Sequence, residues 1–238
     1  MISIKDALYN QMMDVYSSKG IDIVISKCWK LMELSENNAR YEKYQKVKGE
    51  LAEIALECIL LELSKQGKIK GPHIILKSLC ISFINGSTTE MDIVLITEQK
   101  IYMFECKSYK NFPKITDKCL INGKVDVYYQ NTLHTTALHQ RLCSVISKSE
   151  SNSKPYRYIM FEMSTHGVND KRDEKWREMT PIVNADTVLS FLIKEFEKNS
   201  KKDKVVDVTK AVKILKKYDN ESKEMFKKHV ARLKKKYH

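Results

Sequence analysis

The stretch that decides the fold of this chain spans residues 90–107 and reads EMDIVLITEQKIYMFECK. Two apolar runs, at 93–96 and 101–104, flank the short polar segment 97–100, and this pattern predicts a β-hairpin. Carboxylates stand at the outer ends of both runs, where a buried strand would not normally place them. The hairpin is therefore expected to form the centre of a sheet and to carry a cluster of charge.

The register of the hairpin predicts which charged residues meet. If a four-residue turn separates the two runs, residues whose numbers sum to 197 lie opposite each other, so Asp92 faces Glu105 and Glu90 faces Lys107. Opposed Cβ atoms in an antiparallel pair are about 4.5–5.5 Å apart, so two carboxylates there repel unless a cation compensates. A hard divalent cation prefers such oxygen ligands. A turn of three or five residues would break this arrangement; the alternative is an edge hairpin with solvated charges.

Length and charge limit the classes of protein to consider. The chain has 238 residues, 42% of them hydrophobic, which suits one domain of roughly 150 residues with extensions. The net charge is +12, and residues 198–238 hold fourteen Lys and one Arg against five carboxylates. A basic segment of this kind binds phosphates without sequence preference. This favours a nucleic-acid partner, with a solubilising surface as the alternative.

The cysteines and the N-terminus indicate the compartment. Six cysteines occur without a CxxC pair, and several fall inside apolar runs, as reduced core thiols of a cytoplasmic protein do. Residues 1–6 (MISIKD) carry charges where a signal peptide needs an apolar stretch. No uncharged run approaches the roughly 18 residues needed to span a membrane. We therefore expect a cytoplasmic protein without a membrane segment.

Hydrophobic periodicity and turn residues predict the other elements. Besides the hairpin, we expect strands at 73–84, 156–163 and 181–183, and helices within 1–48 and at 49–64, 130–147, 188–196 and in the C-terminal tail. Local alternatives are a strand at 21–25, an N-cap at Ser35 for a third N-terminal helix, a short hairpin at Asn122-Gly123 and a charged loop at 171–178. The order helix, three strands, helix, strand, helix indicates an α/β fold, with a central mixed β-sheet flanked by helices.

This order of elements, with Asp on one strand and Glu-x-Lys on the next, resembles the PD-(D/E)xK nuclease superfamily. Three motifs are similar to those of one branch, the nuclease-related domain (NERD) family: KGELAE at 48–53, Glu90-Met91-Asp92, and Gln130 followed by His134. Two positions differ from the family pattern. Ala52 replaces a glycine in the first motif, and Val127-Tyr128-Tyr129 stands where the family has Asn-Pro before the glutamine.

The resemblance covers residues 46–195 and implies a restriction-endonuclease-like sheet for that part of the chain. Residues 1–45 are then a helical N-terminal extension, and residues 196–238 are a basic helical tail. The helical extensions on both sides are expected to lie outside the nuclease-like domain.

The resemblance implies a metal-dependent nuclease that hydrolyses phosphodiester bonds in DNA with Mg²⁺ or Mn²⁺. Asp92, Glu105, Glu53 and the backbone carbonyl of Cys106 would supply oxygen ligands. Lys107 would orient the attacking water or stabilise charge on the phosphate.

Residues on the two flanking helices have further expected roles. Gln130 would contact the site from the helix that follows the hairpin, and Glu50 is the alternative to Glu53 on the preceding helix. His134 and His139 are interpreted as ordinary helix residues, because no second ligand pair has zinc-like spacing. Phosphate contacts are expected from Lys110, Lys201, Lys202, Lys216, Lys217, Lys227, Lys228, Lys234 and Lys235.

Two other functions fit the sequence. One is a non-catalytic nucleic-acid-binding module of the same fold, because a fold does not fix a function. The other is a protein-interaction component, or a homodimer, that uses the terminal helices. RNA remains an alternative to DNA as the nucleic acid.

Overall fold

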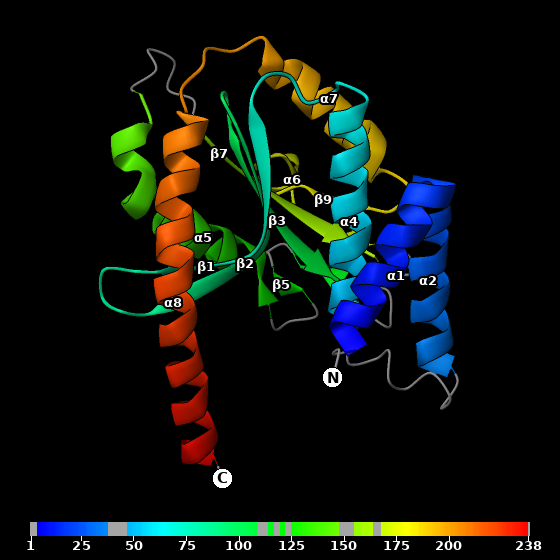
Figure 1. The fold of residues 1–238 in the computed structure, drawn as a ribbon, viewed down its shortest axis with the longest axis horizontal. Helices are drawn as coiled ribbons and strands as arrows, with labels where there is room; N and C mark the ends of the chain where they lie inside the picture. The colour runs from blue at the N-terminus through cyan, green and yellow to red at the C-terminus, as the bar shows by residue number, and fades with distance from the viewer. Residues whose placement is uncertain are drawn as a thin grey trace.

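The predicted hairpin forms the centre of a five-stranded sheet. The computed structural model describes residues 4–37, 47–108, 114–116, 120–121, 125–147, 155–163 and 168–237. The sheet consists of β1 (His73–Ser82), β2 (Thr88–Thr97), β3 (Ile101–Lys107), β7 (Tyr156–Glu162) and β9 (Ile182–Asn184), in that spatial order. The first three strands are antiparallel, whereas β3, β7 and β9 are parallel. The predicted central mixed sheet is confirmed (Figure 1).

The predicted register of the hairpin is also confirmed. Ile96 pairs with Ile101 and Ile93 pairs with Phe104, and both pairs sum to 197. The backbone ladder ends at the second of these pairs. The carboxylates of the hairpin therefore lie just beyond its last ladder pair, at one end of the sheet.

Helices cover both faces of the sheet (Figure 1). One face packs against α1 (Ile4–Lys19), α2 (Ile21–Asn37), α4 (Lys48–Lys65) and α7 (Val188–Ser200). The other face packs against α5 (Val127–Leu142), which continues into a 3₁₀ turn at Cys143–Val145, and against α8 (Val208–Tyr237). The remaining described elements are β4 (Lys114–Ile115), β5 (Leu120–Ile121), β6 (Val125–Asp126), β8 (Asn169–Asp170) and α6 (Glu174–Met179).

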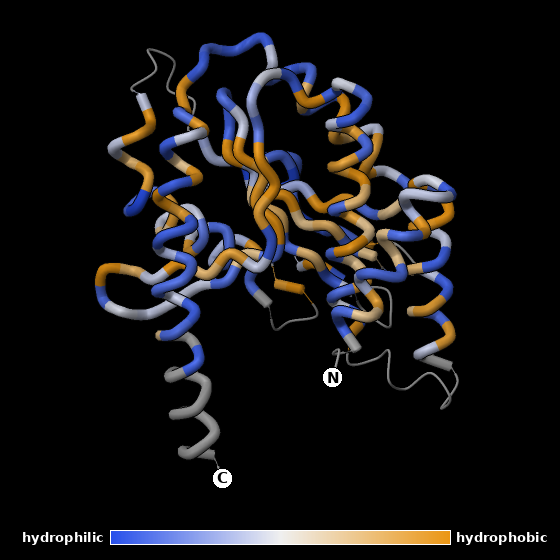
Figure 2. The backbone as a smooth tube through the Cα atoms, in the orientation of Figure 1, coloured by the Kyte–Doolittle hydropathy of each residue, from blue (hydrophilic) through white to orange (hydrophobic). Residues whose placement is uncertain are grey.

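Alternation along the central strands divides the core between the two faces. Leu95 and Phe104 pack towards α4, whereas Val94 and Met103 pack towards α5 and α8, and all four side chains are buried. Side chains of a strand point to opposite faces in turn, so a strand that is buried on both faces is apolar throughout. Figure 2 accordingly shows hydrophobic residues concentrated along the central strands.

The first half of α8 belongs to the fold because it covers the outer edge of β1. Asp219 accepts the backbone N–H of Cys80 at 2.9 Å, and Ser222 Oγ accepts that of Ser82 at 2.8 Å. Leu215 is fully buried against the same face of the sheet. An uncovered edge strand is a site for unwanted strand pairing. The basic tail therefore has a packed part, up to about Ser222, and a part that continues past it.

Several local expectations are corrected by the structure. Residues 21–25 are helical and not a strand, because they begin α2. Ser35 lies within α2, where its hydroxyl donates to the carbonyl of Met32 at 2.7 Å, so it is not an N-cap. The expected loop at 171–178 contains α6, which Asp173 caps by accepting the N–H of Trp176 at 2.9 Å. Strands β5 and β6 pair antiparallel around the predicted Asn122-Gly123 turn, which itself lies outside the described residues.

The described part of the chain contains no helix that is long and apolar enough to cross a membrane. Its cysteines are free thiols: Cys28, Cys58, Cys80 and Cys106 are buried, and Cys143 is exposed. Cys119 lies outside the described residues.

Candidate active site

Asp92 and Glu105 lie near the same end of the β2–β3 hairpin. Asp92 Oδ2 accepts the backbone N–H of Cys106 at 2.7 Å. This side-chain hydrogen bond links the two strands just beyond Ile93 and Phe104, the last pair of the backbone ladder. It keeps the Asp92 carboxylate beside the backbone of Cys106. The regular ladder does not extend to the predicted Asp92–Glu105 pair: Asp92 lines a cleft beside α1 and α4, whereas Glu105 bonds His134 of α5.

An irregularity in β1 and β2 lies at the same level. Lys77 pairs with Ile93 and Leu79 pairs with Met91, which leaves Ser78 and Asp92 between two regular stretches. Ile93 packs on the face covered by α4, and regular alternation would place Met91, two residues away, on that same face. Met91 and Leu79 instead pack towards α5 and α8. Ser78 has φ of 47°, in the left-handed region. Such backbone strain concentrates at functional sites, where the surrounding structure holds it in place.

Substitutions at Ser78 should have opposite effects on stability according to their tolerance of positive φ. The left-handed region costs an L-residue roughly 1–2 kcal/mol, more for a β-branched one, and glycine adopts it freely. We expect Ser78→Gly to leave the unfolding free energy unchanged or raise it by up to about 1 kcal/mol, and Ser78→Val to lower it by about 1–3 kcal/mol. Urea unfolding of both variants measures this difference. A glycine variant less stable than the valine variant would contradict the strain.

Glu105 is enclosed and binds a partner with each oxygen. It is 4% exposed; Oε1 forms an ion pair with Lys107, and Oε2 lies 3.3 Å from Nε2 of His134. Burial alone would raise the pKa of this carboxyl, but the hydrogen bond from His134 and the charge of Lys107 outweigh it, so the pKa is lowered. Glu105 is therefore held in its ionised form.

Asp92 and Glu53 have the opposite electrostatic character. Burial, followed by the negative charge of Glu105, raises the pKa of Asp92 to about 7. Burial, followed by the negative charge of Asp92, raises the pKa of Glu53, on the first turns of α4, to about 8. These three carboxyls thus form a series in which each one opposes the ionisation of the next. A bound cation would relieve that repulsion.

The carboxyls with raised pKa values, those of Asp92 and Glu53, line a cleft of about 470 Å³ between α1, α4, β1 and β2. Lys5 and Tyr9 of α1 also line it. Lys5 forms an ion pair with Glu50. Part of the wall therefore comes from residues 1–45, the expected N-terminal extension of the nuclease-like domain.

Three of the residues that line this cleft, Tyr9, Glu57 and Lys77, contact one another. Lys77 binds Glu57 at 2.8 Å, and its ammonium lies 3.6 Å from the ring centre of Tyr9. Tyr9 also donates to Glu57 at 3.2 Å. These contacts hold α1 against α4 and β1 at the cleft.

The donor set fits a divalent ion that keeps water ligands. Two carboxylates on adjacent strands and the intervening peptide of Cys106 offer oxygens, and Mg²⁺ commonly uses one or two protein carboxylates with waters completing its shell. Burial raises the pKa of the Cys106 thiol, which keeps the sulfur protonated and unsuited to metal binding. Within the described ranges, no three His, Cys, Asp or Glu side chains converge in a ready-made metal cage.

Gln130 and His134 stand four residues apart on α5, and His134 contacts Glu105. Gln130 Oε1 is enclosed, and it has no hydrogen-bond partner within the part of the chain that the structure describes. A buried polar atom without a partner costs about 1–3 kcal/mol, which favours a water, ion or ligand at that position. This is compatible with the expected contact of Gln130 to the site.

His134 was interpreted as an ordinary helix residue without a metal role, and the structure places it in a buried, hydrogen-bonded position. It is 3% exposed, and it bonds Glu105 through Nε2 and Thr89 through Nδ1. The sequence offered one signal: Gln130 and His134 are four residues apart and therefore share a helix face. His139 is exposed, as expected, with its ring 3.4 Å from the hydroxyl of Tyr156.

The expected phosphate-binding lysines do not gather at one place. Lys204 pairs with Glu98 at the β2–β3 turn, so the neighbouring Lys201 and Lys202 lie near that turn. The turn is six residues along the chain from Asp92, about 20 Å in an extended strand. Both lysines are exposed, and the β2–β3 turn lies at the end of the hairpin opposite the carboxylates.

Helix α8 carries the other lysines of this set, apart from Lys110, which lies outside the described residues. Lys216, Lys217 and Lys227 are exposed. Lys228, Lys234 and Lys235 belong to the last turns of α8, where the structure describes the helix and not the side chains. These turns extend past the β1–β2 turn, beyond the body of the protein (Figure 1).

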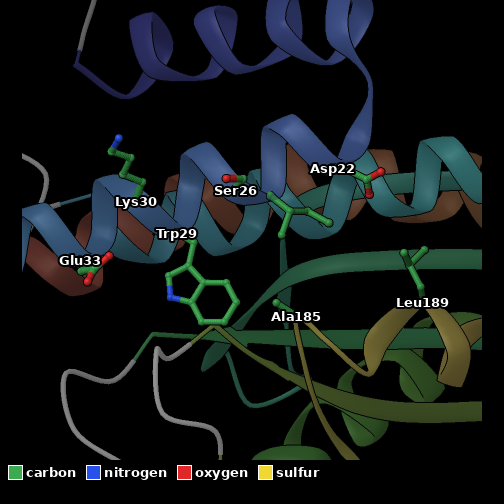
Figure 3. A pocket seen from close by; sticks show the side chains of 8 residues that line it. Asp22, Ser26, Trp29, Lys30, Glu33, Ala185 and Leu189 are labelled. Carbon is green, nitrogen blue, oxygen red and sulfur yellow. The ribbon is translucent and has the colours of Figure 1, made fainter.

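A second hollow lies elsewhere among the described residues and is lined by none of the predicted site residues. It measures about 520 Å³ and lies between α2 and the segment that connects β9 to α7. Figure 3 shows Trp29 of α2 directed towards Ala185, with Asp22 and Glu33 further along the same helix. The chemistry of the carboxylates, and not the size of the hollow, identifies the candidate site.

One protein family model matches part of the chain. Residues 48–162 match the family model of the nuclease-related domain (NERD). This range includes Glu53, Asp92, Glu105, Lys107 and Gln130. No curated protein matches the chain.

Two solved structures align with parts of the chain. Protein VC1899 from Vibrio cholerae aligns over 84% of this chain and 58% of its own, with 10% sequence identity and a TM-score of 0.44. A protein of unknown function, AF1548, aligns over 59% of this chain and 64% of its own, with 10% identity and a TM-score of 0.34. The chain thus spans less than two thirds of either neighbour.

Proposed function

Because residues 48–162 match the family model of the nuclease-related domain, we propose that this protein is a metal-dependent nuclease that hydrolyses phosphodiester bonds in DNA. One observation carries the proposal. The Asp92 carboxylate accepts the backbone N–H of Cys106, next to Glu105, and the negative charge of Glu105 contributes to the raised pKa of Asp92; Lys107 is paired with Glu105.

Each residue of this group has a proposed task. Asp92 and Glu105, with the carbonyl of Cys106, would hold Mg²⁺ or Mn²⁺, and Glu53 would bind it directly or through a water. When bound, the ion would polarise the scissile phosphate and make a nearby water more acidic. Lys107 would stabilise the negative charge that develops on the phosphate. Gln130 would supply a further polar contact from α5.

The distal part of α8 is the proposed phosphate-binding arm. Residues 224–238 contain five Lys and one Arg against one Glu. They follow the segment of α8 that packs beside Cys80 and Ser82, so they leave the body at the end of the sheet that carries the carboxylates. Cationic side chains there would bind the backbone of a duplex or single strand beside the site. We expect a cytoplasmic setting, where the buried thiols stay reduced.

Cleavage of supercoiled plasmid and linear single-stranded DNA tests the proposal. Wild type, Glu105→Ala and the control Glu197→Ala, an exposed carboxylate on α7, are each assayed with Mg²⁺, Mn²⁺ or EDTA. We expect metal-dependent cutting by wild type and control, and its loss in Glu105→Ala. Folded wild type that binds DNA without cutting it in any metal would instead support a non-catalytic binding module.

A further inference from the structure

We infer that His134, oriented by Thr89, is a positioning residue that holds the Glu105 carboxylate in its ion-binding orientation. The inference rests on the proposed function, since it assigns the proposed metal ligand a support from α5. It concerns a contact between residues 29 positions apart in the chain.

The contacts of His134 leave its ring little freedom. Nε2 lies 3.3 Å from Oε2 of Glu105, and Nδ1 lies 2.9 Å from Oγ1 of Thr89 on β2. The ring is stacked on Tyr158 of β7, with the ring centres 6.2 Å apart and the planes 29° apart. At 3% exposure, His134 is fixed from the sheet side by three different strands.

Glu105 determines the direction of these hydrogen bonds. An ionised carboxylate only accepts, so Nε2 must carry a proton and donate it to Glu105. In a neutral ring Nδ1 then has no proton and accepts from the hydroxyl of Thr89. In a charged ring Nδ1 donates to the same hydroxyl. Thr89 therefore completes the chain in either form and orients the ring.

His134 and Lys107 divide the carboxylate between them. Lys107 binds Oε1 and His134 binds Oε2. Each carboxylate oxygen can accept more than one bond, so both retain capacity for a cation. Without His134, the ammonium of Lys107 is the remaining strong partner and draws the carboxylate towards itself. Partners that orient a ligating group in this way typically affect metal affinity by about 10–100-fold when removed.

Two pairs of substitutions separate positioning from packing. His134→Leu removes the donor but fills similar space, whereas the amide of His134→Gln restores a donor near the Nε2 position. Thr89→Val removes the hydroxyl with little change of shape, and Thr89→Ser keeps it. His139→Leu, on the exposed side of the same helix, is the control for a lost histidine.

The test measures Mn²⁺ affinity by titration calorimetry on full-length variants, after thermal unfolding has established that each is folded. We expect His134→Leu to weaken Mn²⁺ binding by about 10–100-fold, His134→Gln to recover most of it, and Thr89→Val to weaken it more than Thr89→Ser. His139→Leu should bind as wild type does. If His134→Leu does not fold, the two Thr89 variants decide the question.

The outcomes distinguish this inference from the proposed function. Wild-type Mn²⁺ affinity in His134→Leu or in both Thr89 variants, together with its loss in Glu105→Ala, would overturn the inference alone. Absence of Mn²⁺ binding by folded wild type would overturn both. A loss in His134→Leu that His134→Gln does not recover would assign His134 a packing role and overturn the positioning role.

Discussion

Asp92→Asn is expected to abolish metal-dependent cleavage and, at the same time, to stabilise the ion-free protein at neutral and alkaline pH. The amide removes one negative oxygen from the proposed ion site, and we expect cleavage to fall by on the order of 10³-fold or more. The substitution also removes a negative charge that is unfavourable in the folded state, because Asp92 is buried and lies near the negative charge of Glu105. A residue kept for stability alone would not combine these two effects.

The pH dependence of this stabilisation follows from the raised pKa of Asp92. The pKa of the Asp92 carboxyl is about 7 in the folded protein and near 3.8 in the unfolded chain, where the carboxyl is in water. Below pH 4 the carboxyl is protonated in both states. As the pH rises from 4 to 7, the unfolded chain releases the proton first, so the stability contributed by the protonated carboxyl is lost through this window. Glu53, with a pKa of about 8, extends the same trend to higher pH in both proteins.

Urea unfolding of ion-free wild type and Asp92→Asn between pH 4 and pH 9 measures the effect. We expect the two curves to meet near pH 4 and to separate as the pH rises, with the variant more stable by about 2–4 kcal/mol at pH 8. Glu197→Gln, at an exposed position, is the control and should follow wild type throughout. A constant difference at all pH values would show that the carboxyl of Asp92 does not titrate in this window.

Two truncations of α8 should differ sharply in their effects. Removal of residues 208–238 takes away buried Ala211 and Leu215 and uncovers the β1 edge that Asp219 and Ser222 bind. We expect this chain to unfold or aggregate, because apolar surface and an unpaired strand edge become exposed together. Removal of residues 224–238 leaves those contacts in place, and we expect the shorter chain to remain folded.

The shorter truncation should instead weaken DNA binding in a salt-dependent way. Each phosphate contact contributes about 0.9 to the slope of log affinity against log salt concentration for duplex DNA. With six cationic residues removed, we expect the slope to decrease by at least about 2. Fluorescence anisotropy with a labelled duplex from 50 to 300 mM NaCl measures it.

The matched control for this truncation is the double variant Lys201→Gln, Lys202→Gln, near the β2–β3 turn. It removes two positive charges away from the candidate site and should change the slope by less than the truncation does. Equal slopes for the truncation and wild type would exclude the distal part of α8 as the phosphate-binding arm.

The sequence predicted the parts of the fold that depend on local periodicity. The register of the hairpin followed from the length of its turn, because a slip of one residue would turn every buried side chain to the wrong face. The helix at α4 followed from a stripe that includes Leu51, Ile54 and Cys58, all of which are buried. The short helix α6 was missed because charged residues dominate its six positions.

The sequence by itself predicted that Asp92, Glu105 and Lys107 lie near the same end of one hairpin, because turn length and strand pairing are local rules. The tertiary structure alone decided that His134 supports Glu105, that α1 forms a wall of the cleft, and that the first half of α8 closes the sheet. The contacts that do so join residues 29 to 140 positions apart. Their formation depends on how each helix packs across the sheet, and periodicity within a single helix does not specify that.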